Sequence, residues 1–424
     1  MTEEQFIPQA PAGTHDVMPP ESFRWQALVA RFAEIATTYG FGLVHTPMFE
    51  DVRVFHRGLG DIAEVVSKEM YEFEDRGGRR LALRPEGTAP VVRAFIQHRP
   101  PTPFKAWYVS PSFRYERPQA GRFRQHHQLG VEVLGSDDAD IDVEVIAMAS
   151  RFFRGLGLQD VRLIINSMGC EACRPAYVTA LSDYLSTHQS SLCDEHAERW
   201  EQNPLRVLDC KKEACVLVTS GGPILREHLC QECSVHHERV RGGLTELGLS
   251  AIQDDRLVRG FDYYTRTTFE FSSSALESAQ NAIGGGGRYD GLVEILGGPP
   301  TPGIGFGVGM ERVLLACDAE NSFEVAGPNP AVFMVDVTGG GHARRIVAAL
   351  RDRGVFAERA YDGRSMKAQL KVADRSGADF AGIIGEQEAQ TRSVTIRALR
   401  HEAEQETLSV EEFLSRFSAL GDRS

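Results

Sequence analysis

The pattern of apolar and polar residues changes across one polar segment that contains proline and glycine, DAENSFEVAGPNP at 318–330. Before it, short runs of aromatic and β-branched residues end in glycine-containing turns, which is typical of antiparallel strands. After it, strand-like runs alternate with segments of helical length, which is typical of a small, largely parallel α/β domain. A chain of 424 residues is also long for a single hydrophobic core. The sequence therefore predicts an α+β domain over 1–325 and an α/β domain over 331–424.

Within the first domain, residues 19–39 have apolar residues near helical spacing, and Gly40 follows as a plausible helix end. AWYVSPSFRYE and HHQLGVEVLG predict two antiparallel strands joined by a long connection that carries arginines. A cysteine-containing segment from about 165 to 245 is predicted to be a mostly helical insertion. GIGFGVGMERVLLA then reads as a glycine-rich strand that runs into a helix.

Arginines concentrate at the end of the first of those two antiparallel strands and in the connection after it, although the whole chain has a formal net charge of -13. They are Arg114, Arg117, Arg122 and Arg124, and two more arginines follow at Arg259, which opens RGFDYY, and at Arg312, which follows GIGFGVGME. The guanidinium group keeps its charge and matches phosphate oxygens bidentately. Any one of these arginines alone is more simply a solvated surface residue. Together with glycine-rich backbone they indicate a polyphosphate site.

Five segments occur in a fixed order: RPEGT at 84–88, FRYERPQAGRFRQHHQLGVEVLG at 113–135, LVRGFDYYTRTTFEF at 257–271, GGGGRYDGLV at 284–293 and GIGFGVGMERV at 303–313. Together they closely resemble the class II aminoacyl-tRNA synthetases, and specifically the histidyl-tRNA synthetase family. The resemblance runs over nearly the whole chain. It implies a catalytic domain with an antiparallel sheet, a helical insertion and a C-terminal α/β anticodon-binding domain. It also implies a ligase that activates L-histidine with ATP and Mg²⁺ and transfers it to the 3′ end of tRNA(His), releasing AMP and diphosphate.

The resemblance assigns the motif arginines to ATP. Arg114 matches the arginine that holds the α-phosphate, Arg122 one near the outer phosphates, and Arg312 the one that clamps the γ-phosphate. Glu116 matches the acid that helps to read adenine, and Arg259 the arginine that reaches the substrate carboxylate and the α-phosphate. Arg114 and Arg259 are therefore the expected catalytic residues. The family commonly has an aromatic residue where this chain has His126, so an imidazole is expected near adenine.

The resemblance also implies a histidine site. Glu86, Thr88 and Gln128 match positions around the substrate's amino and carboxylate groups, with Arg259 beside them. The imidazole pocket is expected to be lined by Glu132, Tyr263, Tyr264 and Tyr289. Outside these motifs, the simpler interpretation of each would be a solvent-facing carboxylate or a core tyrosine.

Seven of the eight cysteines lie between Cys170 and Cys233. Cys170 with Cys173, and Cys230 with Cys233, form two C-x₂-C pairs that could bind zinc, and Cys193, His196, Cys210 and Cys215 lie between them. The pairs are far apart in sequence, and many relatives lack them. Free thiols without a metal are therefore the expectation, with structural zinc as the open alternative.

In the last domain Arg364, Lys367, Lys371 and Arg375 recur at helical spacing, which favours either a solvated basic face or a contact with the anticodon stem-loop. The resemblance implies a homodimer. No secretory signal or membrane span is apparent, so a cytoplasmic protein is expected. A sister ligase of the same class for another amino acid is one rival, and RGFDYY and GGGRYDG argue against it. The main rival is a histidine-binding, synthetase-like regulatory subunit of ATP phosphoribosyltransferase. Such subunits typically lack the anticodon domain and have eroded ATP motifs.

Overall fold

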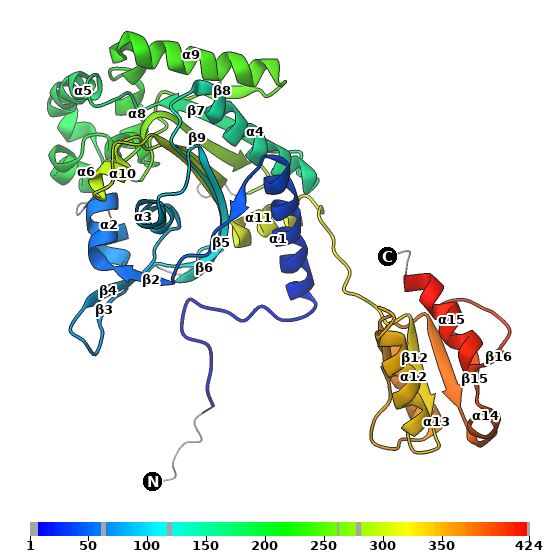
Figure 1. Cartoon of the computed structure of the whole chain (residues 1–424). Helices are drawn as coiled ribbons and strands as arrows, with labels where there is room; N and C mark the ends of the chain where they lie inside the picture. The colour runs from blue at the N-terminus through cyan, green and yellow to red at the C-terminus, as the bar shows by residue number, and fades with distance from the viewer. Residues whose placement is uncertain (1–6, 61–64, 117–120, 261–262, 277–280, 422–424) are drawn as a thin grey trace. The chain divides into compact units, whose positions relative to one another are not determined.

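A computed structural model describes residues 7–60, 65–116, 121–260, 263–276 and 281–421 (Figure 1). Arg117 lies outside these residues, as do Phe261 and Asp262 of the RGFDYY segment. The chain divides into two compact units, Met1–Val325 and Ala326–Ser424. Each unit has its own sheet and its own buried core, and each is described separately below.

Among the described residues, eight strands form the main sheet of the first unit in the order β1-β5-β6-β11-β10-β9-β7-β8. The strands are β1 (Gly42–Leu43), β5 (Phe104–Phe113), β6 (Gln125–Leu134), β7 (Val161–Ser167), β8 (Ala251–Gln253), β9 (Thr265–Ser273), β10 (Ala282–Arg288) and β11 (Gly303–Gly309). In this order, every neighbouring pair between β5 and β7 is antiparallel, as predicted. The two edge strands, β1 and β8, are parallel to their neighbours β5 and β7. The predicted hairpin is β5 and β6, which pair from Phe104↔Leu134 to Phe113↔Gln125.

The two faces of this sheet have opposite character because side chains alternate along each strand. On β6, Leu129, Val131 and Val133 are buried in the main hydrophobic core. Four helices contribute to that core, α1 (Glu21–Thr38), α4 (Ala139–Gly155), α9 (Gln231–Glu246) and α11 (Met310–Ala319). The intervening residues of β6 are His126, Gln128, Gly130 and Glu132, so the opposite face is polar and rich in glycine.

Helix α1 ends as the sequence predicted. The amide of Gly40 donates to the carbonyl of Thr37 at 3.1 Å, and Gly40 has a φ of 77° that favours glycine.

The polar face carries a second set of elements, α2 (Val52–Leu59), η1 (Val65–Glu69), α3 (Thr88–His98) and α10 (Leu292–Ile295), with a small sheet of β2 (Phe49–Asp51), β3 (Glu72–Glu74) and β4 (Arg80–Leu83). Val91 of α3 is buried against Ala106 and Tyr108 of β5. Figure 1 shows α3 and α1 on opposite sides of β5. These helices and the small sheet therefore cover part of the polar face of the main sheet.

The segment between β7 and β8 is helical, as expected. Its elements are α5 (Arg174–His188), η2 (Gln189–Ser191), α6 (Asp194–Arg199), η3 (Trp200–Gln202), α7 (Arg206–Asp209), α8 (Glu213–Ser220), η4 (Leu225–His228) and α9 (Gln231–Glu246). The helical part begins later than 165, because the β-branched run VRLIINS forms β7 and pairs with β9.

The second unit has a five-stranded sheet in the order β13-β12-β14-β15-β16 among the described residues. The elements are β12 (Val332–Asp336), α12 (Gly341–Arg351), β13 (Ala357–Arg359), α13 (Met366–Arg375), β14 (Phe380–Ile384), α14 (Glu386–Thr391), β15 (Ser393–Ala398), β16 (Glu406–Ser409) and α15 (Val410–Gly421). The first three strands are parallel, but β15 and β16 are antiparallel. The expected parallel pattern stops there because the connection through α14 is too short for a crossover to a parallel strand.

Candidate active site

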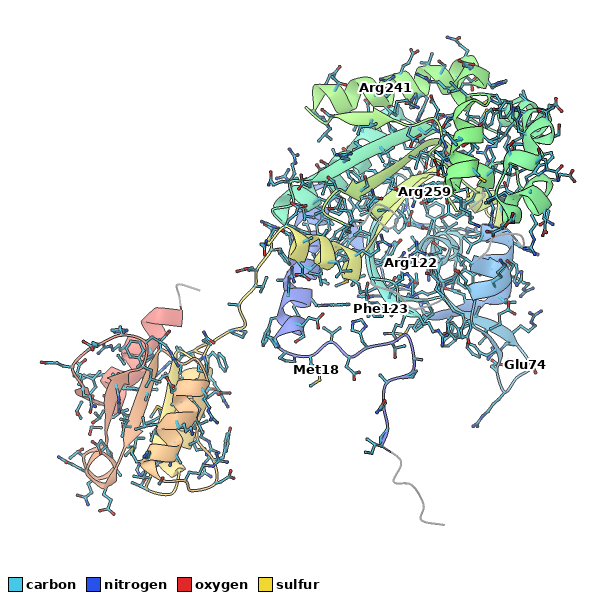
Figure 2. All side chains as sticks on the ribbon, turned by 180° about the vertical axis from the view of Figure 1, so that it is seen from behind. Met18, Glu74, Arg122, Phe123, Arg241 and Arg259 are labelled. Atoms are coloured by element: carbon cyan, nitrogen blue, oxygen red, sulfur yellow. The ribbon has the colours of Figure 1, made fainter. Side chains whose placement is uncertain are left out.

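Two adjoining cavities, of about 860 and 240 Å³, border the polar face of the main sheet. Both are lined by Arg114, Glu116, Arg122 and Arg259, and Arg312 lines the smaller one. Figure 2 labels Arg122 and Arg259, which come from segments far apart in the sequence. The fold thus brings together the predicted ATP-binding residues in the described part of the chain.

Four arginines line the smaller cavity, together with the carboxylates of Glu116 and Glu311. Glu116 accepts from Arg122 at 3.5 Å and lies 3.7 Å from Arg114, whose Nε also donates to the Pro85 carbonyl at 2.9 Å. Burial lowers the pKa of Arg312, and the nearby charge of Arg122 lowers it further. Such crowding of like charges favours a bound polyanion.

Arg259 is held on the sheet by Glu270, and its buried Nε atom has no acceptor among the described residues. Its Nη1 donates to Glu270 Oε2 at 3.0 Å, and its guanidinium carbon lies 6.0 Å from the centre of the Tyr264 ring. A buried donor without a partner is unfavourable unless a ligand accepts from it.

Glu132 lies at the centre of a ring of hydroxyl groups. Its Oε1 accepts from Thr88 Oγ1 at 2.7 Å and from the Tyr108 hydroxyl at 3.2 Å, and its Oε2 accepts from the Tyr289 hydroxyl. Glu132 and Tyr289 are each only 1% exposed. Burial raises the pKa of Glu132 to about 8, although the hydrogen bonds from Tyr289 and Thr88 act in the opposite direction.

Glu86 and Gln128 extend this polar surface in two directions. Glu86 accepts from the amides of Thr88 at 2.6 Å and Ala89 at 2.8 Å, at the start of α3. Burial raises the pKa of Glu86 despite these amides. Gln128 lines the smaller cavity, and its Oε1 accepts from Ser112 Oγ at 3.3 Å.

The three predicted tyrosines form one aromatic group. The ring of Tyr263 lies 4.6 Å from that of Tyr264 and 5.7 Å from that of Tyr289. Tyr264 reaches the larger cavity, as Gln128 reaches the smaller one and Arg259 reaches both. Glu86, Glu132, Tyr263 and Tyr289 are buried next to this surface, and Thr88 is partly buried.

Glycine makes room for these side chains on the sheet. A Cβ on Gly305 would lie 1.9 Å from Glu132 Oε2, and one on Gly303 would lie 2.3 Å from the Tyr289 ring. A Cβ on Gly285 would lie 2.8 Å from Nη1 of Arg259. The glycine-rich motifs therefore let large polar side chains lie flat against the strands.

The sequence interpretation missed three residues of this region. Tyr108 belongs to the hydroxyl ring around Glu132, Glu270 holds Arg259, and Arg174 donates to the Tyr264 carbonyl. Glu270 had a signal, since it is the single acid between Phe269 and Phe271, whose side chains are buried on the opposite face. Arg174 has no comparable signal, because its contact joins segments 90 residues apart.

The two consecutive histidines of β6 have different environments. His126 lines the smaller cavity, and burial, aided by the charge of Arg114, lowers its pKa to about 3. The amide of His127 donates to Glu311 Oε1 at 2.8 Å, and its Nδ1 lies 3.0 Å from the same oxygen. His126 therefore offers an uncharged ring at the cavity, while His127 ties β6 to α11.

The basic residues expected to contact tRNA lie on the second unit. Lys367, Lys371 and Arg375 are exposed on α13, and Arg364 is exposed just before it. The opposite side of the helix carries buried Gln369 and Ala373. These cations thus form a solvent-facing row.

Comparison with known proteins decides the family. Residues 13–313 match the family described as Histidyl-tRNA synthetase, and residues 333–420 match the family described as Anticodon binding domain. The histidine–tRNA ligase of Desulforamulus reducens is 46% identical over 410 residues, which cover 95% of this chain and 97% of that protein. The chain belongs to the histidyl-tRNA synthetase family.

Solved structures agree with this membership. A crystal structure of apo histidyl-tRNA synthetase from Staphylococcus aureus has a TM-score of 0.82 and 33% identity, and the match covers 97% of this chain and all of that one. A Bacillus halodurans structure described as an ATP phosphoribosyltransferase regulatory subunit/histidyl-tRNA synthetase has a TM-score of 0.62 and 22% identity over 84% of this chain and 93% of that one. That second likeness shows the shared fold alone. The predicted catalytic and anticodon-binding folds are confirmed.

Proposed function

We infer that this chain is a histidine–tRNA ligase, which joins L-histidine to tRNA(His) at the expense of ATP. The observation that carries this inference is a single sheet face on which an arginine-lined cavity adjoins the hydroxyl-ringed carboxylate of Glu132. The high identity to histidine–tRNA ligases over nearly the whole chain supports the same conclusion.

The first half-reaction needs positioning and charge neutralisation. The carboxylate of histidine is already ionised near neutral pH, so it can attack the α-phosphorus of ATP without a general base. The new bond to phosphorus forms as the bond to diphosphate breaks, giving histidyl-adenylate. We propose that Arg114 and Arg259 stabilise charge on the α-phosphate, and that Arg122 and Arg312 hold the outer phosphates. Preorganised cations suit a reaction in which charge spreads over phosphoryl oxygens.

The donor set fits Mg²⁺ held largely by phosphate oxygens. Glu116 and Glu311 line the smaller cavity, and carboxylates are the protein ligands that magnesium prefers. When bound, the ion would neutralise phosphate charge. Glu116 is proposed in addition to read the adenine amino group, beside the uncharged ring of His126.

Recognition of histidine is proposed to use the polar surface around Glu132. Its carboxyl group can form a hydrogen bond with an imidazole nitrogen, with Tyr264 and Tyr289 beside it and Tyr263 behind them. Glu86, Thr88 and Gln128 are proposed to surround the substrate's amino group, and Arg259 its carboxylate. The unpartnered Nε of Arg259 supports that role. Sites that pair with polar substrate groups reject apolar mimics strongly.

We propose that the second unit binds the anticodon stem-loop through Arg364, Lys367, Lys371 and Arg375. Phosphate contacts from such a row would position the RNA, and unstacked bases would supply specificity.

A homodimer that uses the edge of the first unit is also proposed. Leu43, Met48 and Phe49 are each about half exposed at 48%, 52% and 50%. They lie on or beside the edge strand β1 and the small strand β2, where a second copy would cover them.

Within the described residues, no helix combines the length and apolarity that a bilayer crossing requires. We propose a cytoplasmic location, where tRNA charging takes place.

The rival regulatory function has less support. The chain retains the motif arginines around its cavity and has a second unit that matches the anticodon-binding family. The deciding experiment is charging of a tRNA(His) transcript with labelled histidine. We expect ATP-dependent transfer to that tRNA and none to a non-cognate tRNA. Histidine binding without charging would favour the regulatory subunit.

A further inference from the structure

Seven of the eight cysteines and one histidine converge in two clusters within the insertion. The first contains Cys170, Cys173, Cys230 and Cys233, and the second contains Cys193, His196, Cys210 and Cys215. In each cluster the four potential ligand atoms lie within 4.8 Å of one another. We propose that each cluster is a structural zinc site, one with four thiolates and one with three thiolates and an imidazole.

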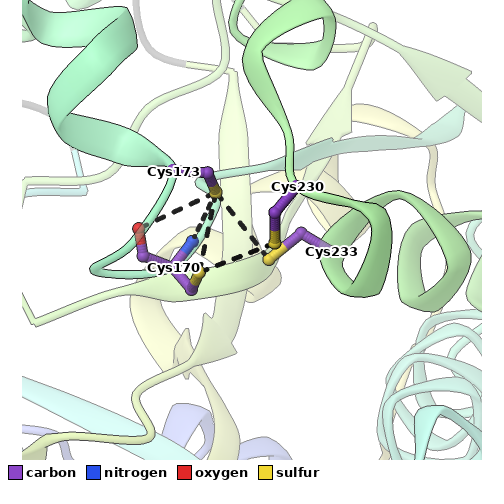
Figure 3. A group of neighbouring side chains, drawn as sticks. All are labelled: Cys170, Cys173, Cys230 and Cys233. Carbon is purple, nitrogen blue, oxygen red and sulfur yellow. Dashed lines mark hydrogen bonds between the residues drawn. The ribbon is translucent and has the colours of Figure 1, made fainter.

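The spacing of the sulfurs in the first cluster matches the edges of a zinc-centred tetrahedron. Zn–S bonds of about 2.3 Å place tetrahedral sulfurs about 3.8 Å apart. The Sγ atom of Cys170 lies 3.6 Å from that of Cys173 and 3.8 Å from that of Cys230, and Cys173 lies 3.9 Å from Cys233. A disulfide would require about 2.0 Å. Figure 3 shows the two pairs facing each other, one from the loop before α5 and one from the start of α9.

The ligand atoms of the second cluster, three sulfurs and one nitrogen, are also spaced as in a zinc-centred tetrahedron. Tetrahedral S and N ligands at about 2.3 and 2.05 Å from zinc lie about 3.6 Å apart. His196 Nδ1 lies 3.2 Å from Cys193 Sγ and 3.9 Å from Cys215 Sγ, and Cys193 and Cys210 are 4.0 Å apart. The two sulfur distances from His196 Nδ1 lie on either side of the expected distance of about 3.6 Å.

Backbone amides already point at two of these sulfurs. The amide of Cys170 donates to Cys173 Sγ at 3.2 Å, and the amide of Cys193 donates to Cys215 Sγ at 3.4 Å. Hydrogen bonds of this kind orient thiolate ligands around a metal. This feature is independent of the spacing of the sulfurs.

The local chain needs a source of stability besides helix formation. Helices α6, α7 and α8 have only 6, 4 and 8 residues, and isolated helices of that length are unstable in water. Zinc binding would supply folding free energy to such a segment directly.

Both clusters connect to the candidate active site. Cys210 and His196 line the larger cavity, and Arg256 donates to the Cys210 carbonyl at 3.2 Å and to the Leu208 carbonyl at 3.0 Å. On the other side, Arg174 follows Cys173 directly and donates to the carbonyls of Met168 and Tyr264. The two ions would thus stabilise the contacts that hold Arg256 and Tyr264, which lie on either side of Arg259 in the sequence.

The test is the metal content of the full-length chain, purified under reducing conditions without added metal. We expect two zinc ions per chain by elemental mass spectrometry. Cys230→Ala and Cys210→Ala should each leave one ion, and Cys317→Ala should leave two, since Cys317 is buried outside both clusters. Exchange of Co²⁺ into the unaltered chain needs no variant, and it should give the visible absorption of tetrahedral cobalt–thiolate.

Eight reactive thiols without zinc, disulfides within the clusters, or bound iron would each overturn the proposal. Two ions retained by Cys210→Ala would overturn the second site, and two ions retained by Cys230→Ala would overturn the first. The metal content does not depend on the proposed function. A chain that holds two zinc ions but fails to charge tRNA would refute the ligase reading and leave the zinc sites standing.

Discussion

The carboxylate of Glu132 lies directly over Gly305 of the neighbouring strand, so close that a Cβ at 305 would be 1.9 Å from Oε2. A Cβ there would also meet the Val131 carbonyl at 2.4 Å. The glycine at this position therefore determines where the central polar group of the candidate histidine site can lie.

Gly305→Ala should destabilise the first unit by about 3 kcal/mol, the upper end for overpacking, because both contacts lie within the sheet. Histidine-dependent activity should fall with it. Gly242→Ala is the matched control, since a Cβ on that glycine in α9 meets nothing within 4 Å. That control should gain about 0.5–1 kcal/mol, as glycine in a helix does when it is replaced by alanine. Urea unfolding of the two variants measures both changes. Equal stabilities would show that Glu132 can lie elsewhere.

Arg259→Gln should lower the rate of histidine activation by about 10²–10³, because one preorganised charge next to the reacting phosphate is lost. The measurement is histidine-dependent ATP–diphosphate exchange at saturating substrates. Arg151→Gln changes an exposed arginine on α4, and its exchange rate should not change. A loss of less than about threefold in Arg259→Gln would remove this residue from the proposed catalytic group.

The buried carboxyl of Glu132 should make stability fall as pH rises from about 4.5 to about 8. The folded chain keeps this proton up to about pH 8, whereas the unfolded chain releases it near the ordinary value of 4.5. The unfolded state thus binds fewer protons in this interval, so the free energy of unfolding declines through it. Glu132→Gln removes that decline, so its stability relative to the unaltered chain should rise with pH and level off above 8.

Denaturant unfolding at several pH values tests this expectation. Glu246→Gln, at an exposed position on α9, should follow the unaltered chain at every pH. A pH profile of Glu132→Gln that runs parallel to that of the unaltered chain would contradict the raised pKa.

Arg288 and Asp142 form an ion pair with both side chains fully buried, 2.8 Å apart. His236 approaches the second oxygen of Asp142 at 2.8 Å, so the group joins β10 to α4 and α9. Arg288→Met should cost about 3–5 kcal/mol, because it leaves a buried carboxylate without its guanidinium partner. Arg239→Met breaks a pair with Asp138 in which both side chains are 54% exposed, and it should cost about 1 kcal/mol or less. Similar losses in the two variants, measured by chemical unfolding, would be inconsistent with this account.

Replacement of Lys367, Lys371 and Arg375 by alanine should weaken binding of tRNA(His). Each lost phosphate contact should also lower the salt dependence of binding by about 1 in the log–log slope. Histidine-dependent exchange should stay unchanged, because these cations lie on the second unit. Titrations of tRNA at several salt concentrations give both quantities. Unchanged affinity and slope would leave the row as a solvated surface.

Much of the fold could be predicted because it follows from local patterns. Alternation along HHQLGVEVLG predicts a strand with one apolar side, and the glycine-rich GIGFGVG predicts a strand that leads into α11. The antiparallel pairing of β15 and β16 in the second sheet was not predicted. It depends on the shortness of α14, which leaves no room for a crossover to a parallel strand. The convergence of the cysteines was not predicted either, since Cys170 and Cys230 are 60 residues apart and meet only through the packing of the insertion.

For the site, motifs predicted which residues matter but not how they are arranged. The sequence did not indicate that Glu132 and Tyr289 are almost fully buried, or that Tyr108 completes their ring. Those relationships depend on strand order, which places β6, β11 and β10 side by side. The individual roles assigned to the ATP-binding and histidine-binding residues stay predictions until they are measured.

The most direct test of the central claim is ATP–diphosphate exchange with the full-length chain, histidine being compared with each other standard amino acid. The proposed ligase function predicts exchange with histidine alone, and a strongly reduced rate in Arg259→Gln. Histidine binding with no exchange under any condition would contradict it, as would equal exchange with another amino acid.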